Sequence, residues 1–230
     1  MLREKQSVIG IKNSIFFLNP LHINVKPTLK GRQHFDEKYV KVKGKDCYDL
    51  NCIDHVTKYI TAHLLVEKRT LAKCKELLKQ IKTTCYDQIL ERYRKERGKP
   101  VKKRKLITFV CDGFENYKTA FDKLFYRVAK IVSGVPIACK KHGLKHNNNA
   151  VERYNGSLKD RIKIMRGGFG SFQGAENFMN LKRVIHNFVN PHQGLKGKTP
   201  AEAAEVKIPL ERNRLLSLIQ YVRRSRITKT

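Results

Sequence analysis

The sequence predicts a mixed α/β domain in which one five-stranded sheet carries helices on its faces. Three observations indicate this fold class: three short β-rich segments within 34–66, a long helical pattern over 70–97, and two later apolar runs, 106–111 and 128–135, separated by a helical segment. Strands joined by tight turns form an antiparallel meander, whereas a strand that follows a crossover helix pairs in parallel. The order therefore favours one sheet with both kinds of pairing rather than a bundle or a sandwich.

Turn residues divide the meander. They are Lys43-Gly44-Lys45 and the stretch 54–58, which contains an aspartate followed by polar residues. Next comes a helix with Thr70 as its N-cap and Gly98 and Pro100 beyond its end. Its core-facing residues recur every three or four positions: Leu71, Cys74, Leu78, Ile81, Cys85 and Ile89.

The strand 106–111 follows a basic connector and ends at Asp112-Gly113. Because the helix before it is a crossover connection, this strand is expected to lie parallel beside the first strand, 34–42. Its carboxyl end then comes close to the middle of that strand. This pairing predicts that Asp36 and Asp112 are neighbours.

Three further helices are expected. In the segment 147–166 one helical face is apolar, and the other carries Glu152, Asn155, Lys159 and Lys163. A helix over 174–189 follows, and Thr199-Pro200 starts another with a capping box and a proline at its first position. Residues 207–230 are expected to form a basic C-terminal tail, residues 32–206 the main domain, and residues 1–31 a short N-terminal extension.

The charge points to a polyanionic partner. Among 230 residues there are 49 Lys and Arg against 20 Asp and Glu, for a formal net charge of +29. A modest excess would be accounted for by solvated helix faces, but one this large opposes a compact state by self-repulsion unless an anion relieves it. Nucleic acid is the expected partner.

The chain carries no membrane or secretion signal. Its apolar runs are shorter than the ~20 residues of a membrane span, and the N-terminus lacks the pattern of a cleaved signal. Its six cysteines form no C-x-x-C pair. We expect a cytoplasmic protein with free thiols and no membrane partner.

Three carboxylates are candidates for metal binding: Asp36, Asp112 and Glu152. Acids are scarce here, and carboxylates from different elements can hold two hard divalent ions for phosphoryl transfer. Simpler roles stay open, because Asp112 before Gly113 fits a turn and Glu152 after Asn149 fits a capping-box variant.

Other candidate ligands are less favoured. Asp54 and Glu37 fit a turn former and an exposed strand residue. Three residues with the spacing C-x₂-H-x₃-H lack the fourth partner of a zinc site, which argues against zinc: Cys139, His142 and His146.

Several ordered motifs resemble one family. They are FDEKYVKVKGK from Phe35, NCID from Asn51, CDG from Cys111, HGLKHNNNAVERYNG from His142, MRG from Met165, HNFVNPHQGL from His186 and KTPAEA from Lys198. Together they resemble a prokaryotic insertion-sequence transposase of the Asp-Asp-Glu (DDE) class, in the retroviral integrase superfamily. The resemblance covers about residues 33–206.

The resemblance implies a ribonuclease H-like fold and a function. Asp36, Asp112 and Glu152 match the catalytic triad, which would hold two Mg²⁺ or Mn²⁺ ions for DNA strand cleavage and strand transfer. The implied partners are double-stranded DNA, as element ends and target, and further copies of the chain assembled on DNA. The implied location is the prokaryotic cytoplasm, at the nucleoid.

The helix that carries Glu152 is the expected DNA-binding element. By the resemblance, Asn155 and Lys159 lie where the integrase helix faces DNA. Basic residues around this helix are candidates for phosphate contacts, although each is also explained as a solvated side chain: Lys145, Arg153, Lys163 and Arg166.

One departure from the family keeps other functions open. Members usually carry a segment that recognises DNA ends before the core, and only about thirty residues precede Asp36 here. These residues show neither a zinc-ligand pattern nor a helix-turn-helix, so we expect an incomplete transposase. The alternatives are a catalytically idle DNA-binding remnant and a ribonuclease H-like nuclease acting on structured RNA or hybrid duplexes.

Overall fold

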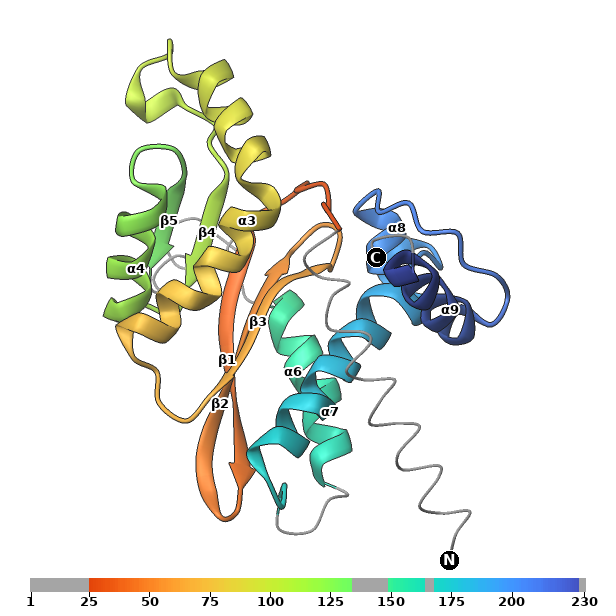
Figure 1. Ribbon diagram of the computed structural model, residues 1–230. Coiled ribbons are helices and arrows are strands. Elements are labelled where there is room, and N and C mark those ends of the chain that lie inside the picture. The colour runs from red at the N-terminus through yellow and green to blue at the C-terminus, as the bar shows by residue number, and fades with distance from the viewer. Residues whose placement is uncertain (1–24, 134–148, 164–167, 228–230) are drawn as a thin grey trace, which may run out of the picture.

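The computed structural model describes residues 25–133, 149–163 and 168–227. One five-stranded sheet runs through it in the order β3-β2-β1-β4-β5, so that β1 is the central strand (Figure 1). The strands are β1 (Gln33–Val42), β2 (Lys45–Asp54), β3 (Ile60–Val66), β4 (Thr108–Cys111) and β5 (Lys130–Ser133).

The sheet contains both kinds of strand pairing that the sequence predicts, antiparallel and parallel. β1, β2 and β3 form an antiparallel meander, whereas β4 pairs in parallel with β1 and with β5. The mixed five-stranded sheet flanked by helices is therefore confirmed. Lys43 and Gly44 form the β1–β2 turn with positive φ angles of 48° and 75°.

Helices cover both faces of the sheet (Figure 1). On one face α3 (Leu71–Glu96) and α4 (Glu115–Phe125) pack against Phe35, Leu50 and Phe109. On the other, α6 (Asn149–Lys163) and α7 (Phe172–Val184) pack against alternate residues of the meander, among them Val40 and Ile53. Each strand of the meander therefore contributes to two separate apolar layers, as period-two alternation requires.

Helix α3 begins and ends where its sequence predicts. The Thr70 hydroxyl accepts a hydrogen bond from the backbone N–H of Lys73, and the cap at the other end is Arg97. Five of the six core-facing residues predicted for it are buried, from Cys74 to Ile89. A short 3₁₀ turn, η1 (Val101–Lys103), then leads back toward β4.

Two amide side chains pair with the backbone of the edge strand β3. Gln80 of α3 donates to the His63 carbonyl at 2.9 Å and accepts from its N–H at 3.1 Å. Asn187 pairs in the same way with Ile60, at 3.1 Å and 2.9 Å. These bonds occupy backbone groups that a free strand edge would leave open to pairing with another chain.

Asp54 organises the turn between β2 and β3. Its carboxylate accepts hydrogen bonds of 2.8–3.0 Å from the backbone N–H groups of Lys30, Gly31, Val56 and Thr57 and from the side chain of Gln33. The interpretation of Asp54 as a turn former agrees with these contacts, which also tie the residues before β1 to the turn.

The C-terminal part of the chain forms a third apolar layer. Helix α7 continues as one π-helical turn, η3 (Ile185–Val189), within the predicted helix 174–189. Beyond it lie η4 (Gln193–Leu195), α8 (Pro200–Ala203), which starts with the predicted capping box, and α9 (Arg214–Ile227). Leu218 and Val222 of α9 are buried against Tyr59 and Phe188. The segment expected as a basic tail therefore contains a packed helix.

Two observations concern membranes and thiols. Within the described ranges, no helix has both the length and the apolar character that crossing a membrane requires. The five described cysteines are free and buried: Cys47, Cys52, Cys74, Cys85 and Cys111.

Candidate active site

Asp36 lies at the centre of the sheet, on the face covered by α6. Its neighbour Phe35 belongs to the apolar layer under α3 and α4, whereas Val40, four residues on, belongs to the layer under α6. Because side chains alternate along a strand, Asp36 points to the α6 side. The side-chain amide of Asn155 on α6 donates a 2.8 Å hydrogen bond to Asp36 Oδ2.

The β1–β4 register brings Asp112 toward Asp36. The parallel pairs are Gln33 with Phe109 and His34 with Val110, so two residues further along the same register sets Asp36 opposite Asp112. Asp112 is exposed, just beyond the end of β4, and its Oδ1 accepts from the backbone N–H of Phe114 at 3.0 Å. It thus forms the turn that its sequence suggests, while its other carboxylate oxygen has no protein partner among the described hydrogen bonds.

Glu152 lies in the first turn of α6, with its side chain exposed. Val151, Tyr154 and Leu158 anchor that helix on the sheet, which leaves Glu152 beside the anchored face. Its carboxylate makes no hydrogen bond or ion pair within the described part of the chain. Asn149 is the first residue of the helix.

The electrostatics of Asp36 link the three carboxylates. Its pKa is raised from the ordinary 3.8 to about 6, mainly by burial and further by the charges of Asp112 and Glu152, against the opposing effects of the Asn155 hydrogen bond and Lys38. A carboxylate crowded by burial and by like charges favours its neutral form. A cation bound between these groups would offset both the burial of the Asp36 charge and the repulsion from the neighbouring carboxylates.

Asn155 has a different position from the one expected. The family resemblance implies that Asn155 faces DNA, but it is only 7% exposed and its amide is directed at Asp36. It lies at the border between the two faces of the helix, one turn after Glu152. Its observed contact orients a carboxylate, which spacing along one helix could not reveal because the partner is 119 residues away.

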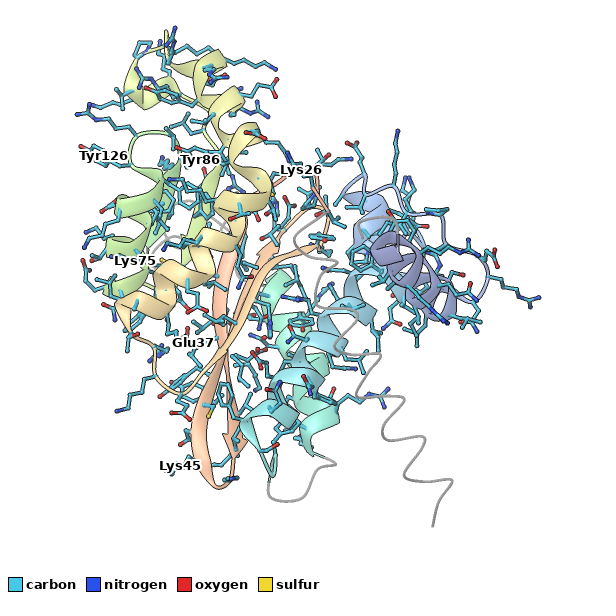
Figure 2. All side chains as sticks on the ribbon, viewed as in Figure 1. Lys26, Glu37, Lys45, Lys75, Tyr86 and Tyr126 are labelled. Carbon is cyan, nitrogen blue, oxygen red and sulfur yellow. The ribbon has the colours of Figure 1, made fainter. Side chains whose placement is uncertain are left out.

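A second cluster, which sequence reasoning missed, holds the Asp112 loop against the meander. Arg69 pairs with Glu37 of β1, and its guanidinium lies over the rings of Tyr48 and Phe114, at 5.0 Å and 4.6 Å from their centroids. Glu37, labelled in Figure 2 beside the central strands, is therefore an ion-pair partner rather than an exposed strand residue. Since Phe114 follows Asp112 by two residues, this cluster fixes the loop that carries Asp112.

The basic residues predicted to contact DNA fall into two groups. Arg153, Lys159 and Lys163 are exposed on the helix, where they are accessible to a ligand. Lys145 and Arg166 lie outside the described residues, as do the three residues with zinc-like spacing, Cys139, His142 and His146.

A comparison with protein families covers most of the chain. Residues 31–192 match the model for the DDE domain of IS240-type transposases. The chain belongs to this family. Asp36, Asp112 and Glu152 all fall within the matched residues of this DDE transposase domain.

Comparisons with solved structures return viral integrases and a transposase. The DDE domain is similar to the HTLV-2 integrase catalytic core domain in a trimeric magnesium complex, at 14% identity and TM-score 0.48, over 78% of this chain and 99% of that one. It is also similar to a chain of the simian T-cell lymphotropic virus intasome bound to the PP2A subunit B56 gamma, at 13% identity and TM-score 0.49, over 81% and 62%. For the Mos1 mariner transposase catalytic domain the values are 11%, 0.39, 95% and 92%. A search of curated protein sequences gave no match.

The donor chemistry of the DDE domain suits a hard divalent cation. Its candidate ligands are carboxylate oxygens, which Mg²⁺ and Mn²⁺ prefer, and two of the three are exposed to solvent. In the described ranges no three His, Cys, Asp or Glu side chains stand close enough together to form a complete metal site. The three carboxylates fit such an ion by type and charge, and Asp36 is the most buried of them.

Proposed function

We propose that this DDE domain cleaves DNA strands and transfers them to target DNA, using two Mg²⁺ or Mn²⁺ ions held by Asp36, Asp112 and Glu152. The observation that carries the proposal is the β1–β4 register, which sets Asp36 opposite Asp112, together with the charges of Asp112 and Glu152, which add to burial in raising the pKa of Asp36. The family supports the same activity, because its model covers all three residues.

When bound, the ions supply activation of the attacking oxygen and neutralisation of charge on the leaving oxygen. The attacking group is water in the cleavage reaction and a freed 3′-hydroxyl in the transfer reaction. No covalent link to the protein is required. The chain's own carboxylates must be ionised to hold cations, so Asp36 has to lose the proton that its surroundings favour.

Other residues of the chain prepare this site. Asn155 holds one oxygen of Asp36 and leaves the other available. The cluster around Arg69 fixes the loop of Asp112. Both contacts reduce the number of conformations the carboxylates lose when they bind ions, which is how supporting residues improve a catalytic site.

Double-stranded DNA is the proposed substrate. The charge of +29 supports a polyanion, and exposed Arg153, Lys159 and Lys163 flank Glu152 on α6. We further propose that copies of the chain assemble on DNA. The solved structures it resembles are described as a trimer and as an intasome, which is consistent with that assembly.

The test is a nicking and strand-transfer assay on pre-nicked or branched DNA with Mn²⁺. Such DNA lessens the demand for end recognition. Asp36→Asn, Asp112→Asn and Glu152→Gln should each abolish the metal-dependent products while DNA binding stays equal or slightly tighter, since each removes a negative charge near phosphates. Asp160→Asn is the matched control, because Asp160 is an exposed carboxylate on the same helix.

Each other outcome assigns a different function. Wild-type protein that binds the DNA but yields no metal-dependent product would identify an idle DNA-binding remnant. Products from RNA or hybrid duplexes but not from DNA would identify a ribonuclease H-like nuclease. A fully active Glu152→Gln variant would remove that residue from the metal site, since glutamine can still serve as a helix cap.

A further inference from the structure

A small basic pocket lies between the β2–β3 turn, the first half of α6 and the segment that follows η3. Three cationic or protonatable side chains from these three elements line it: Lys58, Arg153 and His192. Its volume is about 230 Å³. That is below the roughly 300–1,000 Å³ of typical small-molecule sites, so the pocket suits a single anionic group rather than a whole nucleotide.

The Lys58 corner of the pocket is rigidly built. Lys58 has a positive φ of 60°, its ammonium donates to the His55 carbonyl, and its own carbonyl is 2.8 Å from Nε2 of His186. Burial lowers the pKa of His186 to about 4, against a smaller opposing effect of its bond to Lys58. His186 is therefore neutral at physiological pH, donates from Nε2 to Lys58, and packs edge-on against Tyr154 as a fixed wall.

His192 keeps one ring nitrogen as a hydrogen-bond donor. Its Nδ1 accepts a hydrogen bond from the backbone N–H of Gly194 at 3.2 Å. In a neutral imidazole the proton must then be on Nε2, which makes that nitrogen a donor. His192 can therefore donate to an anion whether or not the ring is charged.

The pocket concentrates positive charge without a matching carboxylate. No ion pair joins Lys58, Arg153 or His192 to an acid in the described part of the chain. Burial and then the charge of Arg153 lower the pKa of Lys58, and burial and then Lys58 and Arg153 lower that of His192. Asp54 acts in the opposite direction on Lys58, but its oxygens are already occupied by N–H donors.

We propose that this pocket binds one backbone phosphate of the DNA strand that crosses the carboxylate site. Arg153 directly follows Glu152 on α6, so the same turn of one helix carries a pocket residue and a proposed metal ligand. Lys58, Arg153 and His192 would act as positioning residues that set which phosphodiester reaches the carboxylates. The proposal rests on the proposed function for its choice of DNA as the source of the phosphate.

The first part of the test measures how many DNA phosphates the pocket residues neutralise. The dissociation constant for a short duplex is measured over a range of salt concentrations for Lys58→Gln, Arg153→Gln and the double variant. Each phosphate neutralised contributes about 0.9 to the log–log slope, so if both residues hold the same phosphate the double variant loses about one unit. Two separate phosphates would give a loss of about two units and would overturn the shared pocket. Lys75→Gln, on α3 (Figure 2), is the matched control and should leave the slope within error.

The second arm uses inorganic phosphate and the ring resonances of His192 in the NMR spectrum of the full chain. Phosphate should shift these resonances in the wild type and not in Arg153→Gln. Because Arg153 is exposed, its replacement should not disturb the fold, so the loss of the shift would report loss of phosphate binding. No shift in the wild type would overturn the site. A shift together with unchanged DNA slopes would show a small-anion pocket that DNA does not use, which contradicts the proposal.

These experiments distinguish failure of the phosphate pocket from failure of the proposed catalytic function. If the slopes change as expected but wild-type protein yields no metal-dependent products, the pocket stands and the catalytic function does not. If products form normally and the slopes are unchanged in all variants, the function stands and the pocket is wrong.

Discussion

Asp36 carries an electrostatic cost in the metal-free protein that a substitution should reveal. Its carboxyl titrates near 3.8 when unfolded and near 6 when folded. Folding therefore takes up a proton between these pH values, and the free energy of unfolding falls as the pH rises through that window. The penalty develops between these two pKa values, is complete well above pH 6 and is absent well below 3.8.

Asp36→Asn should accordingly stabilise the metal-free protein at neutral pH, by roughly 1–2 kcal/mol once the partial solvent access of the carboxylate is allowed for. The gain should vanish toward pH 4, where the wild-type carboxyl is also neutral. Urea unfolding of both proteins across this range measures it. A constant difference at all pH values would mean that lost packing or hydrogen bonding, rather than charge, accounts for the effect.

Replacing Asp54 should lower the free energy of unfolding, because both of its carboxylate oxygens accept hydrogen bonds from N–H donors. Asp54→Asn puts an NH₂ group among five donors whichever way the amide turns. The variant should lose about 2–4 kcal/mol of unfolding free energy, the cost of unsatisfied buried groups. Asp46→Asn is the control, since its exposed pair with Lys41 contributes at most about 1 kcal/mol. Equal losses in the two variants would contradict the assignment.

At the scale of elements, α9 is a structural helix. Leu218 is fully buried in the third apolar layer, whereas Leu216 on the same helix is 50% exposed. Leu218→Ala should cost about 2–4 kcal/mol and Leu216→Ala less than about 0.5 kcal/mol. Thermal and urea unfolding compare the two substitutions. Similar small losses would mean that α9 is dispensable to the fold.

Most elements could be predicted from local signals, since each depends on residues close in sequence. The Thr70 cap, the turn at Gly44 and the capping box at Thr199 are of this kind. The prediction of a basic tail missed α9 as a packed helix, although apolar residues recur there at helical spacing: Leu215, Leu218, Ile219 and Val222. Their importance comes from distant partners such as Tyr59.

The residues of the candidate site also divide into those that a local sequence pattern marks and those that it does not. Motif spacing and strand order could single out Asp36, Asp112 and Glu152, because each lies in a recognisable local pattern. The contact of Asn155 with Asp36 and the Glu37–Arg69 pair span 119 and 32 residues. Nothing in the local sequence specifies such pairs, since they arise only when the sheet and helices are assembled.

For the whole molecule, the charge of +29 should make stability depend on salt. Like charges repel in the compact state, and salt screens them over a Debye length of about 10 Å at 0.1 M. The melting temperature should therefore rise from low to moderate NaCl concentration, and rise further with duplex DNA at the same ionic strength. Differential scanning calorimetry measures both. A melting temperature that falls with salt would show that attractive ion pairs outweigh the repulsion.

The alternation along β1 has an evolutionary consequence. Asp36 and Glu37 are adjacent acids that point to opposite faces, one toward Asn155 and the other toward Arg69. A slip of one residue in one direction would set Glu37 against the amide but Lys38 against the guanidinium. A slip in the other direction would set Asp36 against the guanidinium but Phe35 against the amide, so either slip leaves one of the two partners without its acid. Insertions and deletions in this strand should therefore be far rarer among active descendants of this gene than point substitutions, even substitutions that alter its charge.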